Sequence, residues 1–128
     1  MAVASEIESE IKSWLQIALT EDNLKELSVK VLGNSEKGDG YMGDIVFAFV
    51  SGVTENGSTK EYNLVLKCGK RSEALRKQSP VREVFLNEIY IYKELLPAYT
   101  QFQLDKGIED PFDSVPKCYG TFVSGDME

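Results

Sequence analysis

Apolar residues at helical spacing open the chain. They recur every three or four positions and therefore share one helical face: Ile7, Ile11, Trp14, Leu15 and Ala18. Ser5, followed three residues later by Glu8, matches the capping box that begins many helices. The pattern predicts an amphipathic helix at the start of the chain.

The pattern then changes to alternation and short β-favouring runs. Apolar and polar residues alternate over 27–33, which predicts a first strand. The apolar run Ile45 to Val50 predicts a second strand, and the turn signal Asn56-Gly57 leads into a third strand from Glu61 to Cys68. We therefore expect three antiparallel strands.

A second helix is expected where Ser79 provides an N-cap and Pro80 occupies the first helical position. Its apolar stripe includes one acid: Val81, Val84, Phe85, Glu88, Ile91, Tyr92 and Leu95. Pro97 is expected to end this helix. The segment Ala98 to Ser114 then reads as a long connection, with a short helix inside it as an alternative, and Val115 to Val123 reads as a fourth strand. These elements together predict an α+β fold.

Two charged residues lie where the pattern calls for apolar ones. Lys67 closes the apolar run Tyr62 to Leu66, and Glu88 lies in the middle of the helical stripe. Breaking a buried ion pair costs about 3–5 kcal/mol, whereas an exposed pair contributes about 0–1. Mutual pairing therefore explains both positions best. Two plainer explanations remain open: a lysine that extends into solvent at a strand end, and a purely structural ion pair.

A glycine motif lies between the first two predicted strands. Gly38, Gly40 and Gly43 form G-x-G-x-x-G. In a dinucleotide-binding fold this motif joins a strand to a helix, whereas here it joins two antiparallel strands, as in the phosphate loop of kinases. Asp39 and Asp44 add negative charge close to where phosphates would lie. An acidic hairpin turn is therefore the alternative interpretation.

Composition limits the function further. With 128 residues, 42% of them hydrophobic and 27% charged, the chain has the composition of one soluble domain. A net charge of −7 without a Lys/Arg cluster argues against nucleic acid and anionic membranes as partners. No apolar stretch reaches transmembrane or signal-peptide length, so we expect a cytoplasmic protein.

Two residue types restrict the chemistry. Histidine is absent, which excludes His-based triads, His general bases and most zinc sites. Cys68 and Cys118 are isolated, so we expect two reduced thiols. The four acids between Asp105 and Asp113 lack the spacing of a calcium loop. No metal site is predicted.

Several phrases of the sequence resemble one family, the ecdysteroid-kinase-like (CHK-kinase-like, juvenile-hormone-inducible) small-molecule kinases of insects. Leu64-Val65-Leu66-Lys67 resembles the kinase strand motif V-A-I-K. The stretch Phe85 to Pro97 resembles the family helix F-x-x-E-x-x-F/Y-Y-x-x-x-L-P, and Val115 to Tyr119 resembles the strand that follows it. Choline and aminoglycoside kinases share the looser pattern.

The resemblance implies a protein-kinase-like N-lobe, in which an antiparallel sheet carries an amino-terminal helix and a C-type helix. It implies ATP as the cofactor and a steroid-like or xenobiotic hydroxyl as the acceptor. Lys67 would bind phosphate, Glu88 would position Lys67, and Val65 would pack on the adenine. The remaining nucleotide-binding candidates belong to the glycine loop: Gly38, Gly40, Tyr41 and Gly43.

Part of the family pattern is missing. Family members carry an H-x-D catalytic loop and a D-F-type metal site in a second lobe. We therefore expect residues 1–128 to form an N-terminal lobe with no catalytic residue or Mg²⁺ ligand of its own, inactive without a C-terminal lobe or a full-length relative as partner. The alternatives are a naturally short, non-catalytic regulatory module and an ordinary α+β domain.

Overall fold

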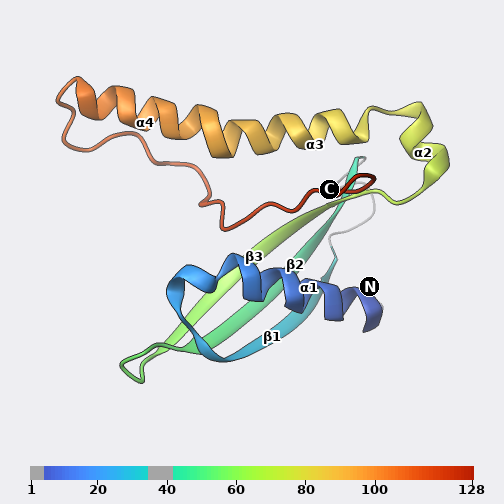
Figure 1. Cartoon of the computed structure of the whole chain (residues 1–128), viewed down its shortest axis with the longest axis horizontal. Coiled ribbons are helices and arrows are strands. Elements are labelled where there is room, and N and C mark those ends of the chain that lie inside the picture. Colours follow the sequence, from blue (N-terminus) through green and yellow to red (C-terminus); the bar gives the residue numbers. More distant parts are fainter. Residues whose placement is uncertain (1–4, 35–41) are drawn as a thin grey trace.

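The computed structural model describes residues 5–34 and 42–128. Two helical segments are not α-helices: η1 is a 3₁₀-helix and η2 is a π-helical turn. A third segment, α2, is an α-helix of six residues. The elements follow one another along the chain as shown in Figure 1: α1 (Ser5–Ala18), η1 (Thr20–Asp22), β1 (Lys25–Asn34), β2 (Gly43–Val53), β3 (Thr59–Gly69), α2 (Glu73–Gln78), α3 (Val81–Tyr90), η2 (Ile91–Leu95) and α4 (Leu96–Asp105).

The three predicted strands are confirmed, and each is a few residues longer than expected. They form an antiparallel sheet in the order β1-β2-β3. β2 and β3 pair without interruption from Gly43 opposite Gly69 to Val53 opposite Thr59. The turn between them contains Gly57 at φ 84°, a left-handed conformation that glycine adopts without steric cost.

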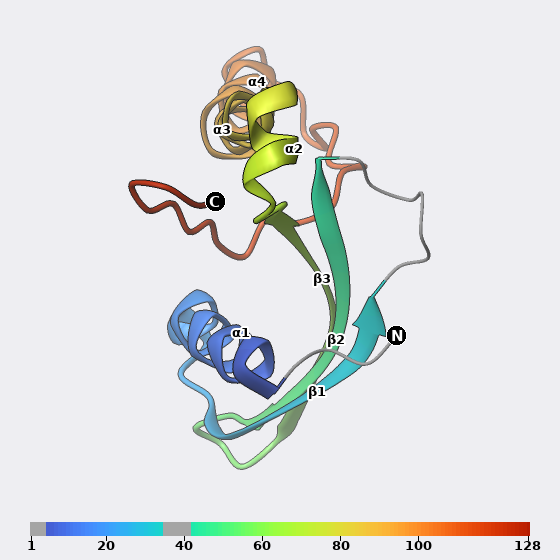
Figure 2. The ribbon, with the colours of Figure 1, turned by 90° about the vertical axis from the view of Figure 1, so that its right-hand side faces the viewer.

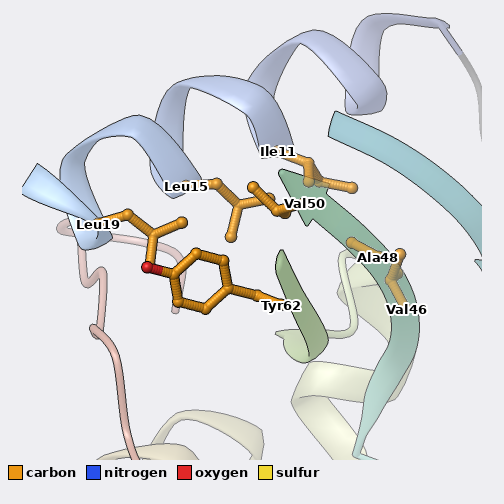
Figure 3. Close-up of a cluster of buried hydrophobic side chains, with 7 residues drawn as sticks. All are labelled: Ile11, Leu15, Leu19, Val46, Ala48, Val50 and Tyr62. Carbon is orange, nitrogen blue, oxygen red and sulfur yellow. The ribbon is translucent and has the colours of Figure 1, made fainter. Parts of the chain in front are cut away.

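The predicted amino-terminal helix is also confirmed, although the Ser5 side chain of its expected capping box lies outside the described residues. α1 lies across one face of the sheet (Figures 1 and 2). Between them lies the hydrophobic core drawn in Figure 3: Ile11, Leu15, Leu19, Val46, Ala48, Val50 and Tyr62. Because side chains alternate along a strand, Ile45, Phe47 and Phe49 point to the opposite face.

The prediction that Pro97 ends the second helix is wrong. α3, η2 and α4 follow one another as one long helical rod (Figure 1). In the π turn the Leu96 N–H donates to the Ile91 oxygen five residues back, so the helix is wider just before the proline. Since Pro97 lies at the start of α4, where its missing N–H costs little, the helix continues to Asp105 and occupies half of the expected connection.

The start of the second helix also differs from the prediction. Ser79 does not cap α3; its N–H donates to the Leu75 oxygen and closes α2, a helix that the sequence interpretation missed. Pro80 is the N-cap of α3, with no side-chain capping bond. A usable signal existed, because Ser72 caps α2 through a 3.4 Å bond from the Leu75 N–H and Glu73 follows it.

The predicted fourth strand over Val115 to Val123 is wrong, because these residues pair with no strand in the described structure. Individual side chains attach the segment instead. Tyr119 meets the Tyr62 ring edge-to-face at 5.8 Å, and Phe122 stacks on Trp14 at 6.1 Å. The apolar residues that suggested a strand are therefore anchors onto the core and α1.

Candidate functional site

The predicted pair between Lys67 and Glu88 is confirmed. Lys67 Nζ on β3 lies 2.7 Å from Glu88 Oε1 on α3. The pair is less buried than the sequence suggested, because the two side chains are 53% and 36% exposed. At that exposure an ion pair adds little to stability. The pair instead orients the Lys67 ammonium group relative to α3.

The strand register places Lys67 beside an apolar surface. Lys67 lies opposite Ile45, and Val65 lies opposite Phe47. All four belong to the sheet face that α1 leaves uncovered. Val65 is 59% exposed and Phe47 is 40% exposed, so this surface is open to a ligand. It combines an exposed cation with a flat apolar area.

Ile45 is a further residue of this surface, which the sequence interpretation did not single out. It follows Gly43 by two positions and lies directly opposite Lys67. The signal was present, since the kinase glycine motif extends to G-x-G-x-x-G-x-V and Ile45 occupies the last position.

The glycine motif is only partly visible. Gly38, Gly40 and Tyr41, together with Asp39, lie outside the described residues. Gly43 begins β2 and has a clear steric reason to be glycine. A Cβ at this position would lie 2.6 Å from the Cys68 carbonyl oxygen and 2.6 Å from Phe85 Cζ.

Asp44 does not face the lysine site. It alternates with Ile45 along β2, and its carboxylate forms an ion pair with Lys70 Nζ. Lys70 is also held through its backbone, since its N–H donates to the Met42 oxygen at 3.1 Å. Of the two acids that favoured an acidic turn, Asp44 is therefore neutralised on the other side of the strand.

The two cysteines are free, as predicted. Burial, followed by the nearby charge of Asp44, raises the pKa of the Cys68 thiol. Cys68 therefore stays protonated near neutral pH and behaves as a structural residue. Across residues 5–34 and 42–128, no three His, Cys, Asp or Glu side chains gather as metal ligands, and no described helix could cross a membrane.

A second cluster of charges was not anticipated, which we call the Glu128 clasp: Arg76, Arg82 and Glu128. The Glu128 side chain is fully buried, 2.7 Å from Arg76 Nη1 and 3.4 Å from Arg82 Nη1. The Gly69 N–H donates to the Glu128 backbone oxygen at 2.9 Å. The clasp therefore joins the end of the chain to β3, α2 and α3. No sequence signal links residues so far apart.

These features define a class of protein. An antiparallel sheet with a helix on one face, and a lysine on the third strand paired to a glutamate on the following long helix, is a kinase-like N-lobe of the α+β class. The profile of the ecdysteroid kinase-like family matches residues 37–126, and the chain belongs to this family, as the sequence resemblance predicted. Comparisons with curated proteins and with solved structures each gave no match.

Proposed function

We propose that this chain is the ATP-binding lobe of a small-molecule kinase. The observation that carries the proposal is the Lys67–Glu88 pair, set on an open sheet face beside Val65 and Phe47. In protein kinases the corresponding lysine binds the nucleotide phosphates, and the corresponding glutamate holds that lysine in place.

The residues present fit a nucleotide. An ammonium group has three N–H donors, and Lys67 uses one of them on Glu88, so two donors are left for phosphate oxygens. Val65 and Ile45 would lie under the adenine, and Gly38, Gly40 and Gly43, with Tyr41 at the rim, would line the phosphates. Asp44 is already paired with Lys70 and does not oppose the phosphate charge.

The acceptor that we propose is a hydroxyl group on a steroid-like or xenobiotic small molecule, to which ATP supplies its terminal phosphoryl group. Such a transfer requires a base and Mg²⁺ ligands. We propose that a C-terminal lobe, or a full-length relative, provides them as partner, and that Mg²⁺ binds with that partner. The free thiols of Cys68 and Cys118 support a cytoplasmic location.

Titration with MgATP tests the nucleotide proposal. We expect Lys67→Met to weaken binding roughly ten- to a hundredfold, because a hydrogen bond to a charged group contributes about 1.5–3 kcal/mol. Lys77→Met is the matched control, because it removes the same charge and Lys77 pairs with the exposed Glu73 on α2. Equal affinity of the Lys67→Met variant and the native chain would refute the proposal.

A non-catalytic binding or regulatory module is the second candidate, and one observation favours it. An apolar groove of about 460 Å³ lies along α4, away from Lys67, and is lined by Leu96, Tyr99, Phe102, Phe112 and Val115 among others. A single cooperative thermal transition with no MgATP binding would support this candidate. Lys67-dependent MgATP binding would favour the kinase lobe.

A further inference from the structure

Two glycines face each other at the end of the sheet. Gly43 at the start of β2 lies opposite Gly69 at the end of β3. Gly43 is two residues before Ile45 and Gly69 is two residues after Lys67, so all four lie on one sheet face. The facing pair leaves an area without side chains, which we call the glycine floor (Gly43 and Gly69).

Side chains from elsewhere in the chain occupy the glycine floor. Phe85 of α3 lies on Gly43, where a Cβ would come within 2.6 Å of the ring atom Cζ. On Gly69, a Cβ would come within 2.5 Å of Glu128 Oε1 and 3.2 Å of Arg76 Nη1. The helix and the Glu128 clasp thus lie closer to the sheet than a Cβ at these two positions would allow without a shift of its neighbours.

This close approach fixes the helix that carries Glu88. Phe85 and Glu88 are three residues apart and therefore lie on the same side of α3. At its start α3 is held by the fully buried Val81 and by Arg82 of the Glu128 clasp. Closer to Glu88, Val84 and Leu86 are 40% and 38% exposed. Phe85 therefore contacts the sheet within one helical turn of the ion pair.

We propose that Phe85 is a positioning residue, which brings Glu88 within reach of Lys67 by resting on Gly43. The proposal deepens the proposed function and rests on it, because the pair that it positions is the proposed phosphate contact. It also connects the last glycine of the phosphate loop to α3, so that a change in the loop is transmitted to Glu88.

Competitive acetylation of lysines, followed by peptide mass spectrometry, reports whether Lys67 is paired with Glu88. The measurement requires no nucleotide. An ammonium group held by Glu88 reacts more slowly than a free one. We expect Phe85→Ala to accelerate acetylation of Lys67 by up to about fivefold, the most that an exposed ion pair supports. Glu88→Gln, which removes the charge of the partner, gives the largest acetylation rate expected for Lys67. Phe85→Met, which keeps an apolar side chain of similar length, should leave the acetylation rate of Lys67 at its native value.

Two controls separate positioning from general stability. Leu86→Ala removes an exposed apolar side chain of the same helix and should leave Lys67 unchanged. Lys60, which is bonded to Asp22 near the opposite end of β3, should keep its native rate in every variant. The proposal is overturned if Lys67 is unaffected by Phe85→Ala, if Lys60 accelerates in parallel, or if Glu88→Gln itself has no effect.

A second measurement distinguishes failure of this inference from failure of the proposed function. In MgATP titrations we expect Phe85→Ala to weaken binding and Leu86→Ala to leave it unchanged. A native chain that does not bind MgATP contradicts the proposed function, whereas the acetylation result still decides whether Phe85 positions the pair. Binding that is unchanged by Phe85→Ala contradicts the positioning role.

Discussion

At the scale of single residues, the sequence predicted the pairing of charges better than the burial of side chains. The mutual pairing of Lys67 and Glu88 followed from their two unexpected positions, and the structure shows the bond. Their exposure could not be predicted, because burial depends on which face of the sheet α1 covers. The Glu128 clasp was equally inaccessible, since its residues meet only after α2 and α3 have formed.

Gly43 offers a direct test at this scale. We expect Gly43→Ala to lower the free energy of unfolding by about 1–3 kcal/mol, because a new methyl group would overlap the Cys68 carbonyl oxygen and the Phe85 ring. Urea unfolding measures the change. Gly125→Ala is the control, because a Cβ at that position meets nothing within 4 Å, and it should leave the stability nearly unchanged.

Asp22 should make the stability depend on pH. The hydrogen bond from Tyr62, and then the bond from Lys60, lower the pKa of the Asp22 carboxyl below its usual 3.8 and outweigh the opposing effect of burial. A carboxyl whose pKa is lower in the folded state stabilises the fold above the unfolded pKa. This contribution is lost as the pH falls through the folded pKa.

Urea unfolding near neutral pH and again at about pH 3 therefore tests the role of Asp22. We expect the native chain to lose more stability between these conditions than Asp22→Asn, which has no charge to lose. Equal losses in the two proteins would show that the bonds from Tyr62 and Lys60 do not favour the ionised form.

At the scale of elements, the pattern of apolar residues located the first helix and the three strands. It failed at Pro97 and in the segment Val115 to Val123. Alternation predicted the first strand, an apolar run the second and a turn signal the third, and all three strands are present. Pro97 was misleading, because the π turn before it lets the helix continue, and such a turn has no periodic signature. The segment Val115 to Val123 was misleading because apolar residues mark anchoring side chains as well as strands.

The packing of α1 provides a matched comparison within one helix. Ile11 is fully buried against the sheet, whereas Ile17 is 61% exposed. We expect Ile11→Ala to cost about 2–5 kcal/mol, from lost burial plus the cavity left behind, and Ile17→Ala to cost less than about 1. Chemical denaturation compares the two. Similar losses would mean that α1 does not pack as described.

At the scale of the whole molecule, a strong net negative charge coexists with many exposed apolar side chains. The chain carries −7 at neutral pH and has an isoelectric point near 4.7. Among its largest exposed apolar side chains are Phe102 on α4 and Phe112 in the segment that follows. Charge repulsion therefore opposes contact between copies through these surfaces.

We expect the chain to self-associate when that repulsion is removed. Light scattering should show larger species near pH 4.7 than at neutral pH. The double variant Phe102→Ser and Phe112→Ser should reduce the effect, whereas Ile17→Ser, on α1, should reduce it less. Association that is indifferent to the two phenylalanines would place the contact elsewhere.

The glycine floor also has an evolutionary consequence. A relative that acquires a larger residue in place of Gly43 has no room for an aromatic ring above it, so the two positions are not free to drift separately. Gly43 and Phe85 should therefore change together across the family, with smaller residues at position 85 wherever position 43 has gained a side chain. Substitutions in the loop and in the helix would then be coupled during the evolution of the family.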